Sequence, residues 1–340
     1  MAKINLLTIH WGNSYGAVFQ TYATCRLLES FGHDVTVINL IHKKAVDKFK
    51  HIKEYTNLIS HIQFWKFKRC FFSRLTKKMT TLDINKIPNS DFTVIGSDQV
   101  WNRDITSYLA PSFFGDFAHN RLVALSSSFG KRSWSEEGIY TMQVKNLLKR
   151  FQAISVREDS GLEILNNVFQ VDATQLLDPT LIYGDFFNFI KRKGRNKNEI
   201  FCFIFNNSSN VKAIKLTISR ELHLPLKKEN FITRRLCASP ISWLNNIYNS
   251  KFVVTDSFHG VAFCVIFKKN FVALCANKEK FTRIESLLKK LGLLDRIIYS
   301  IDELNNNIHM LHNSINYNSV DKILELERQR CYDYLLRSFA

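Results

Sequence analysis

The sequence predicts an α/β protein made of two Rossmann-like, doubly wound domains. Short apolar, β-branched runs of strand length alternate with stretches of helical periodicity along the chain. The 340 residues are enough for two domains of ordinary size. We expect an N-terminal domain over residues 1–180 and a C-terminal domain over 181–340 that ends in a long helix. Two such layers facing a central cleft form the GT-B arrangement.

The first half opens with a strand, a loop, a helix and a second strand. Ile4–Ile9 is an apolar run, a helix is expected from Gly16 to about Phe31, and Val35–Leu40 is the next strand. Further strands are expected over 91–95, 122–125 and 153–156, with helices over 136–150 and 160–167. The glycines at 12 and 16 do not form GxGxxG, and GxxxxGK[ST] is absent, so the dinucleotide and P-loop motifs are not present.

The second half repeats the alternation around the stretch KFVVTDSFHGVAFCVIFKKNFVAL, residues 251–274. It predicts a buried strand, a loop, an apolar helix and another strand. Ser257 can cap the helix, and His259 and Gly260 follow in its first turn. Free N–H groups at a helix start attract anions, so this loop is either an anion site or a helix cap with an incidental histidine. Arg283 is expected near the start of a later helix.

Composition limits the class of protein. Hydrophobic residues make up 46% of the chain, so a sizeable core is expected. No apolar run has the length of a membrane span, and the N-terminal run is too short for a signal peptide, so we expect a cytoplasmic protein. Seven widely spaced cysteines without a CxxC pair favour free thiols over zinc or disulfides.

The net charge of +17 indicates an acidic partner, and it is unevenly spread. Residues 43–78 carry eleven Lys or Arg against two acids, which is +9 of the total. Within this segment HIQFWKFKRCFFSRL, residues 61–75, interleaves aromatics with cations. Such a pattern is typical of a helix on a membrane surface, of an ordinary helix with a solvated basic face, or, less often, of a nucleic-acid groove.

Two loops at predicted strand ends carry further candidate residues. Asp98, in Gly96–Asn102, can act as a general base, accept hydrogen bonds from sugar hydroxyls or cap a helix. Arg157 follows the strand at 153–156. It either pairs with Glu158 or Asp159 or offers a bidentate fork to a phosphate or carboxylate.

Several motifs in order resemble the polysaccharide pyruvyl transferase family. They are NSYGAVFQTYA at the N-terminus, IGSDQVWN (95–102), Ser126–Gly130, ISVRE (154–158), LDPT (177–180), VTDSFHGVAF and the later Arg283…LLKKLGL. Some branches of the family carry Arg-Leu-His-Gly where this chain has Ser257-Phe258-His259-Gly260. The resemblance runs from Ile4 to about Arg296.

The resemblance implies a transferase that moves the enolpyruvyl skeleton of phosphoenolpyruvate onto two hydroxyls of one sugar, giving a pyruvate ketal on a cell-surface polysaccharide precursor. His259 and Asp98 are the expected catalytic residues. The expected phosphoenolpyruvate-binding residues are Arg157, Ser257, His259, Gly260 and Arg283. The expected acceptor-binding residues are Asn13, Tyr15, Gly16, Gln99, Trp101 and Asn102, with Trp101 stacking on a sugar ring.

No metal and no cofactor besides the donor substrate are expected. The acceptor is expected to be a polyprenyl-diphosphate-linked oligosaccharide, reached from the inner face of the cytoplasmic membrane through residues 43–78, with no nucleic-acid partner. Two alternatives are a GT-B glycosyltransferase using a nucleotide sugar and a basic nucleic-acid-binding protein. The apolar helix after His259 lacks acidic residues to hold a ribose, and nucleic-acid motifs are absent, so both are less favoured.

Overall fold

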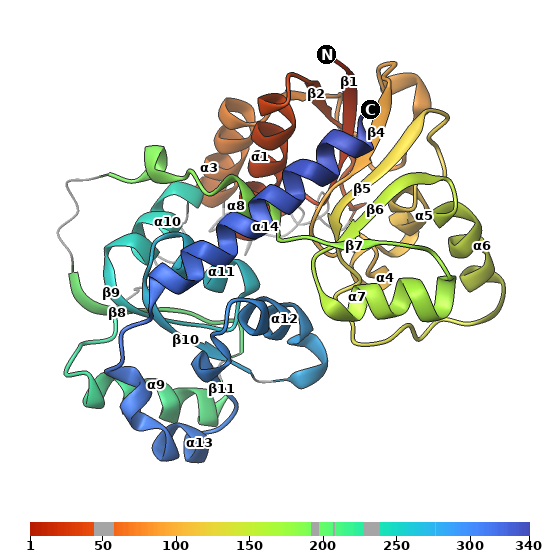
Figure 1. The fold of residues 1–340 in the computed structure, drawn as a ribbon. Coiled ribbons are helices and arrows are strands. Elements are labelled where there is room, and N and C mark those ends of the chain that lie inside the picture. The colour runs from red at the N-terminus through yellow and green to blue at the C-terminus, as the bar shows by residue number, and fades with distance from the viewer. Residues whose placement is uncertain (44–57, 192–196, 207, 228–238, 276) are drawn as a thin grey trace. The chain divides into compact units, whose positions relative to one another are not determined.

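The structure is a computed structural model that describes residues 1–43, 58–191, 197–206, 208–227, 239–275 and 277–340. The chain forms two compact units. The first comprises Met1–Tyr183 together with Glu327–Ala340, and the second comprises Gly184–Leu326. Each unit has its own parallel sheet and its own core, and each is described by itself below (Figure 1).

The first unit is built on a seven-stranded sheet in the order β3-β2-β1-β4-β5-β6-β7, and all its strand pairs are parallel. The strands are β1 (Lys3–Leu7), β2 (Asp34–Val37), β3 (Arg74–Leu75), β4 (Phe92–Ile95), β5 (Arg121–Ser127), β6 (Phe151–Val156) and β7 (Thr174–Gln175). All four residues of β4 are buried, as expected of a parallel strand covered on both faces. The two-residue strands β3 and β7 are too short to leave a pattern in the sequence.

The strand order of the first unit reverses between β1 and β4, so the loops after these two strands flank a topological switch point. In doubly wound sheets, ligands bind at the carboxyl ends of the strands beside such a point. The helices of this unit are α1 (Tyr15–Ser30), α3 (Leu58–Phe71), α4 (Arg103–Thr106), α5 (Ala110–Phe113), α6 (Gly138–Leu148), α7 (Asp159–Ile164) and α8 (Pro179–Tyr183).

The second unit has a four-stranded parallel sheet in the order β11-β10-β9-β8. Its strands are β8 (Lys197–Phe203), β9 (Ser250–Thr255), β10 (Asn270–Leu274) and β11 (Ile297–Ile298), and its helices are α9 (Ser209–Glu221), α10 (Pro240–Asn249), α11 (Phe258–Ile266), α12 (Thr282–Lys290) and α13 (Ile301–Asn306). The predicted strand–loop–helix–strand stretch is therefore β9, α11 and β10. All nine residues of α11 are buried, which explains why all of them except His259 are apolar or glycine.

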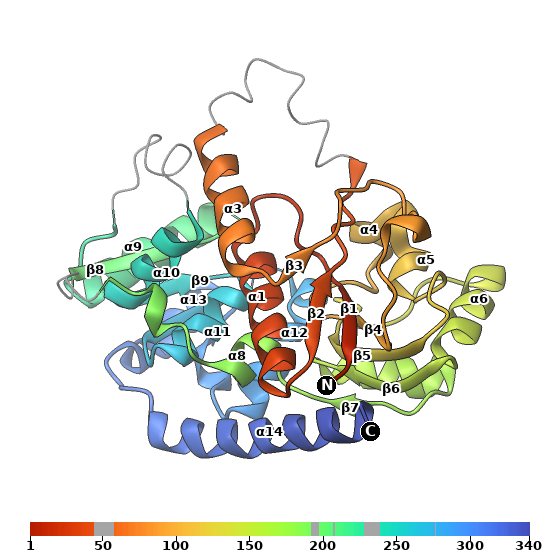
Figure 2. The ribbon, with the colours of Figure 1, turned by 90° about the horizontal axis from the view of Figure 1, so that it is seen from above.

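The helix α3 carries part of the basic segment and packs against α1 through aromatic rings (Figure 2). Phe64 and Phe67 are buried, and their rings lie 5.2 Å from Tyr15 and 5.1 Å from Phe19. Phe72, just after the helix, is buried as well. If the aromatic and basic pattern of residues 61–75 marks a membrane-surface helix, these three phenylalanines are not the side chains that meet the membrane, because they fill the core. Residues 44–57 of the basic segment lie outside the described residues.

The outward side of α3 remains exposed. Ile59, Ile62 and Trp65 are 47%, 41% and 54% exposed, and they recur every three residues along one helix face. Lys66 and Arg69 are exposed beside them, with the Arg69 guanidinium 5.1 Å from the centre of the Trp65 ring. Among the helices of the described part of the chain, none is long and apolar enough to cross a bilayer.

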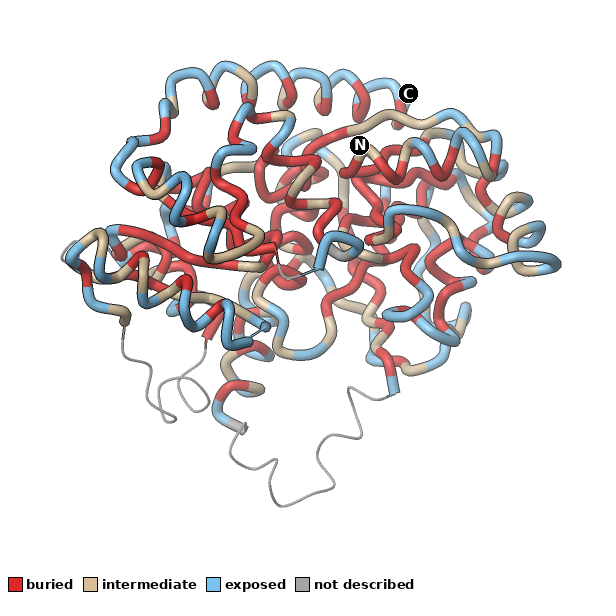
Figure 3. Tube along the Cα trace, turned by 90° about the horizontal axis from the view of Figure 1, so that it is seen from below, coloured by how far each residue is buried: buried red, intermediate tan, exposed pale blue. Residues whose placement is uncertain are grey.

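The terminal helix α14 (Tyr317–Ser338) departs from the domain division expected from the sequence. Its last part, from Glu327, belongs to the first unit rather than to residues 181–340. The Tyr334 hydroxyl donates a 2.8 Å hydrogen bond to the carbonyl of Ala124 in β5, and the ring of Phe339 lies 4.9 Å from that of Phe92 in β4. Figure 3 shows buried residues along one side of the helix. Chain order alone assigns the whole helix to the C-terminal domain. Tertiary packing decides which core it covers, and its last part covers the core of the first unit.

Two neighbouring leucines test this assignment. Leu335 is fully buried and Leu336 is 61% exposed. Leu335→Ala should lower the free energy of unfolding by about 2–5 kcal/mol, because it leaves a cavity in the core. Four of the five tryptophans lie in the first unit, so denaturant unfolding followed by tryptophan fluorescence reports mainly on that unit.

Leu336→Ala is the matched control and should change stability by less than about 0.5 kcal/mol. Equal unfolding midpoints for the two variants would contradict the packing of the C-terminal segment on the first unit.

Candidate active site

Four loops of the first unit converge at the carboxyl edge of its sheet. Ser97 and Asp98 follow β4, Ser128 follows β5, Arg157 follows β6, and Asp178 lies after β7. Every one of these side chains except that of Asp98 is buried. Because adjacent parallel strands end at one edge, motifs far apart in sequence form one polar cluster.

Arg157 is the centre of this cluster. Its Nη1 lies 2.7 Å from Oδ2 of Asp178, and its Nη2 lies 3.2 Å from Oδ1 of Asp98. Its Nε lies 3.8 Å from Oε2 of Glu158. Burial alone disfavours the charge, but the carboxylates of Asp178, Asp98 and Glu158 outweigh it and raise the pKa of Arg157 above its usual range.

The expected role of Arg157 as a fork for the donor is therefore not the role this geometry gives it. Its guanidinium is fully buried and is directed at protein carboxylates. The simple alternative, a pair with Glu158 or Asp159, is nearer to what is found, although the shortest contact is to Asp178, which is twenty-one positions away. Arg157 positions the loops rather than offering its fork to a ligand.

Glu158 and Asp178 complete the cluster; the sequence analysis considered Glu158 only as a possible partner of Arg157 and gave Asp178 no role. Oε1 of Glu158 accepts hydrogen bonds from the Ser128 hydroxyl and from the backbone N–H groups of Phe129 and Gly130, at 2.8, 3.0 and 3.2 Å. Oδ1 of Asp178 accepts from the N–H and hydroxyl of Thr180. Both acids stand in motifs that carry the family resemblance, Glu158 in ISVRE and Asp178 in LDPT. Buried beside Arg157, these acids and the arginine satisfy one another's charge and hydrogen bonds.

Asp98 is the member of the cluster that reaches solvent, with its side chain 14% exposed. Its backbone has φ +80°, a left-handed conformation that a non-glycine residue adopts at a cost. Oδ1 accepts from the backbone N–H of Gln99 and from Arg157. Asp98 is not a helix cap, because Asn102 caps α4 by accepting from the N–H of Asp104. An oriented and partly accessible carboxylate is suited to accept a proton or a hydroxyl hydrogen bond.

Trp101 does not have the predicted role. It is 2% exposed, its Nε1–H donates to the carbonyl of Phe113, and its ring stacks on Phe114 at 5.7 Å. A sugar cannot stack on a ring enclosed in this way, so Trp101 is a core residue. Gln99 and Asn102 bond to each other: Nδ2 of Asn102 donates to Oε1 of Gln99 at 3.0 Å.

The predicted N-terminal acceptor residues lie in the loop after β1 and at the start of α1. Nδ2 of Asn13 donates to the Ser60 hydroxyl of α3, and the ring of Tyr15 contacts α3 through Phe64. Gly16 is buried in the first turn of α1. The loop is thus held partly by α3, a contact that the sequence did not indicate.

In the second unit the start of α11 has the predicted cap. Ser257 accepts a hydrogen bond from the N–H of Gly260, and His259 is 7% exposed in the first turn. A Cβ on Gly260 would lie 2.4 Å from Oγ1 of Thr255, so only glycine lets the helix start this close to the end of β9. The helix start and the histidine are therefore held rigidly at the carboxyl edge of this sheet.

Arg283 joins this group from α12. Its guanidinium carbon lies 5.9 Å from the centre of the Phe258 ring, and the same ring lies 5.1 Å from that of His259. The structure thus gathers Ser257, His259, Gly260 and Arg283 in one unit, while Asp98 and Arg157 belong to the other. Within the described ranges, no group of three or more His, Cys, Asp or Glu is arranged to hold a metal ion.

The central arginine gives a stability prediction. Arg157→Ala leaves buried carboxylates without their cation, and it should lower the free energy of unfolding by about 3–5 kcal/mol. Arg157→Lys keeps the charge but loses the fork and should cost less. Chemical denaturation measures both, and Arg337→Ala, at an exposed site on α14, is the matched control. Unchanged stability of Arg157→Ala with weakened donor binding would restore the donor-binding role.

Solved structures of sugar-nucleotide enzymes share the fold. A UDP-N-acetylglucosamine 2-epimerase from Rickettsia bellii has TM-score 0.50 and 8% identity, with 99% of this chain and 96% of that chain covered. The Neisseria meningitidis UDP-GlcNAc 2-epimerase, bound to UDP-GlcNAc, has TM-score 0.50, 10% identity and coverages of 99% and 100%. The S. aureus MnaA–UDP co-structure has TM-score 0.52, 10% identity and coverages of 95% and 95%. At these identities the likeness shows the fold alone, which is GT-B.

No curated protein sequence matches the chain. The family model for polysaccharide pyruvyl transferases matches residues 15–278. The matched range includes the Asp98–Arg157–Asp178 cluster of the first unit and the Ser257–His259–Gly260 helix start of the second. The chain therefore belongs to the polysaccharide pyruvyl transferase family.

Proposed function

We propose that the protein uses phosphoenolpyruvate to form a pyruvate ketal on one sugar of a cell-surface polysaccharide precursor, such as that of a capsule or exopolysaccharide. One sugar hydroxyl adds to C2 of the donor while a proton is added to its methylene carbon. A second hydroxyl then displaces inorganic phosphate. The methylene carbon thereby becomes a methyl group, and C2 exchanges its bond to the phosphate oxygen for two C–O bonds to the sugar. The reaction involves no net oxidation or reduction, so it needs no redox cofactor.

The arrangement around Phe258 is the observation that carries the proposal. Phosphoenolpyruvate has a phosphate and a carboxylate, and the second unit has a nine-residue helix whose capped start lies beside Arg283. Backbone N–H groups and a guanidinium are the donors that such anions prefer. We propose that Ser257, Gly260 and Arg283 bind the donor. In this proposal Ser257 supplies cap geometry where some branches of the family carry arginine.

His259 is the proposed acid. Imidazole can deliver a proton near neutral pH and can also act as a cation beside departing phosphate. Asp98 is the proposed base or hydroxyl acceptor, because it is the accessible carboxylate of its cluster. Arg157 acts indirectly by holding Asp98.

The chemical step is tested on His259. His259→Asn should keep the fold and lose about a hundred- to ten-thousand-fold in phosphate release from phosphoenolpyruvate in the presence of acceptor. His309→Asn, an exposed histidine of the same unit, should keep full turnover. Near wild-type turnover of a folded His259→Asn variant would exclude the acid role.

Binding of phosphoenolpyruvate is tested by substituting Arg283. Arg283→Ala should weaken phosphoenolpyruvate binding roughly ten- to a hundredfold, the effect of losing a charge-assisted contact. Arg220→Ala, at an exposed arginine on α9, is its control.

Thermal-shift measurements with phosphoenolpyruvate and with UDP- and GDP-sugars distinguish the proposed function from the main alternative, a GT-B glycosyltransferase. Stabilisation by a nucleotide sugar and not by phosphoenolpyruvate would favour the glycosyltransferase.

The acceptor is proposed to be lipid-linked, on a polyprenyl diphosphate at the inner face of the cytoplasmic membrane. The exposed side of α3 supports this, because Ile59, Ile62 and Trp65 form an apolar stripe with Lys66 and Arg69 beside it. A cation near an anionic bilayer contributes about 1 kcal/mol, and aromatic and aliphatic side chains enter the headgroup region. We propose a peripheral enzyme that docks through this stripe. Nucleic acid is the less favoured acidic partner.

Vesicle co-sedimentation tests the docking surface. Lys66→Glu/Arg69→Glu should reduce binding to anionic vesicles several-fold, and added salt should weaken wild-type binding, since it screens exposed charges. Lys212→Glu/Arg220→Glu makes the same charge change on exposed residues of α9 and is the control. Equal binding of the two variants, or wild-type binding without salt dependence, would contradict docking through α3.

A further inference from the structure

A buried threonine links two neighbouring loops at the carboxyl edge of the first sheet. Thr8 follows β1, and its hydroxyl donates a 2.7 Å hydrogen bond to the carbonyl of Ser97 in the loop after β4. That carbonyl belongs to the peptide group that leads into Asp98. We infer that Thr8 is a positioning residue for Asp98, because it holds the backbone conformation that presents the carboxylate. The inference rests on the proposed function, in which Asp98 is the base or hydroxyl acceptor.

The backbone of Asp98 needs such support. Its φ of +80° depends on how the Ser97–Asp98 peptide plane is turned, and a non-glycine residue keeps this value only where its surroundings compensate for the strain. Arg157 and the N–H of Gln99 hold the carboxylate end of the residue. The hydrogen bond from Thr8 acts at the other end, on the peptide itself. Together these contacts fix the direction in which the carboxylate leaves the backbone.

Gln20, in α1, determines where the Thr8 hydroxyl directs its hydrogen. Its Nε2 lies 2.9–3.1 Å from four oxygens, the hydroxyls of Thr8 and Thr21 and the carbonyls of Ile9 and Ala17. Both hydroxyls direct their own hydrogens to backbone carbonyls, so they present lone pairs to the amide nitrogen. Because Thr8 accepts from Gln20, its single hydrogen is free for Ser97. Thr8, Gln20 and Ser97 are all 0% exposed, so solvent does not compete for these bonds.

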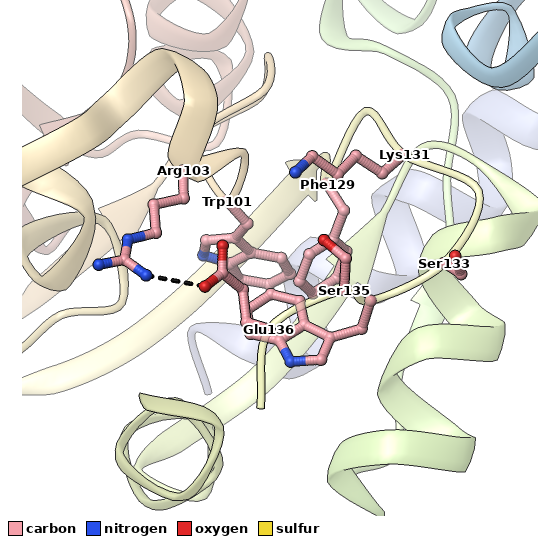
Figure 4. A pocket seen from close by; sticks show the side chains of 8 residues that line it. Trp101, Arg103, Phe129, Lys131, Ser133, Ser135 and Glu136 are labelled. Atoms are coloured by element: carbon pink, nitrogen blue, oxygen red, sulfur yellow. Dashed lines mark hydrogen bonds and ion pairs between the residues drawn. The ribbon is translucent and has the colours of Figure 1, made fainter. Parts of the chain in front are cut away.

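The loop after β4 is shaped for this contact. A Cβ on Gly96 would lie 2.9 Å from Cβ of Thr8, so a larger residue at position 96 would push the two loops apart. The far end of the same loop is anchored by packing, since the ring of Trp101 lies 5.1 Å from that of Phe129 (Figure 4). Loss of the threonine hydroxyl should therefore act on the peptide between these two anchors.

Turnover tests the inference first. Thr8→Val removes the hydroxyl and keeps the volume of the side chain. It should lower kcat about ten- to a hundredfold, as expected when a reacting group is misplaced. The KM for phosphoenolpyruvate should stay unchanged, because the proposed donor-binding residues belong to the second unit. Thr8→Ser keeps a hydroxyl and should restore turnover.

Thr93→Val is the matched control. Thr93 lies on β4 and is also buried, and its hydroxyl donates to Oδ1 of Asn120 rather than to a loop at the carboxyl edge. This variant should keep full turnover. If Thr8→Val does not fold, Thr8→Cys carries the same expectation, since a thiol has similar volume and is a weak donor.

A measurement without turnover tests the positioning directly. The N–H of Gln99 donates to Oδ1 of Asp98 at 2.9 Å, so its amide NMR signal reports on the placement of the carboxylate. The signal should shift in Thr8→Val and stay in place in Thr8→Ser and Thr93→Val. An unmoved Gln99 signal in Thr8→Val, or equal losses of turnover in Thr8→Val and Thr8→Ser, would overturn the inference.

Asp98→Asn separates failure of this inference from failure of the proposed function. If Thr8 acts through Asp98, Thr8→Val should change turnover little in the Asp98→Asn background, whereas a full additional loss there would overturn the inference. A shifted Gln99 signal together with unchanged turnover of Asp98→Asn would contradict the proposed role of Asp98 and leave its positioning by Thr8 intact.

Discussion

The buried ion pair between Arg157 and Asp178 is the interaction on which the first unit depends. A guanidinium and carboxylates removed from water are stable only when each satisfies the others. Here one arginine joins the loops after β4, β6 and β7, and Glu158 extends the network to the loop after β5. The cluster therefore fixes the carboxyl edge of the sheet, where a doubly wound domain binds its ligands.

This arrangement separates positioning from chemistry. Arg157 and Asp178 are enclosed, whereas Asp98 reaches solvent from a left-handed backbone conformation. Strain at that position is maintained because Arg157 and the Gln99 N–H both hold the carboxylate. The same network fixes the backbone after β5, because the N–H of Phe129 donates to Glu158. One buried charge cluster thus determines the geometry of the candidate base and of the neighbouring loop.

In the second unit, close packing at a glycine fixes the start of the helix at the carboxyl edge of the sheet. A glycine at 260 allows α11 to begin against Thr255, and the apolar helix that follows is enclosed on all sides. The result is a fixed helix start with His259 and Arg283 packed against one phenylalanine. Preorganised backbone N–H groups with a cation nearby are suited to bind a substrate that carries two anionic groups.

The sequence by itself determined the α/β class, the main strands and the strand–loop–helix–strand of β9, α11 and β10, because apolar periodicity follows directly from burial on a parallel sheet. It also determined the family, because the motifs and their order can be read directly from the sequence. Only the tertiary structure decided which of the motif residues are accessible. Arg157 and Trp101 have the chemistry of ligand-binding residues, yet one is enclosed by carboxylates and the other by aromatic rings. Likewise the last part of α14 packs on the core of the first unit, and the buried phenylalanines of α3 pack against α1. Burial is set by contacts between residues far apart in the chain, and no local pattern contains that information.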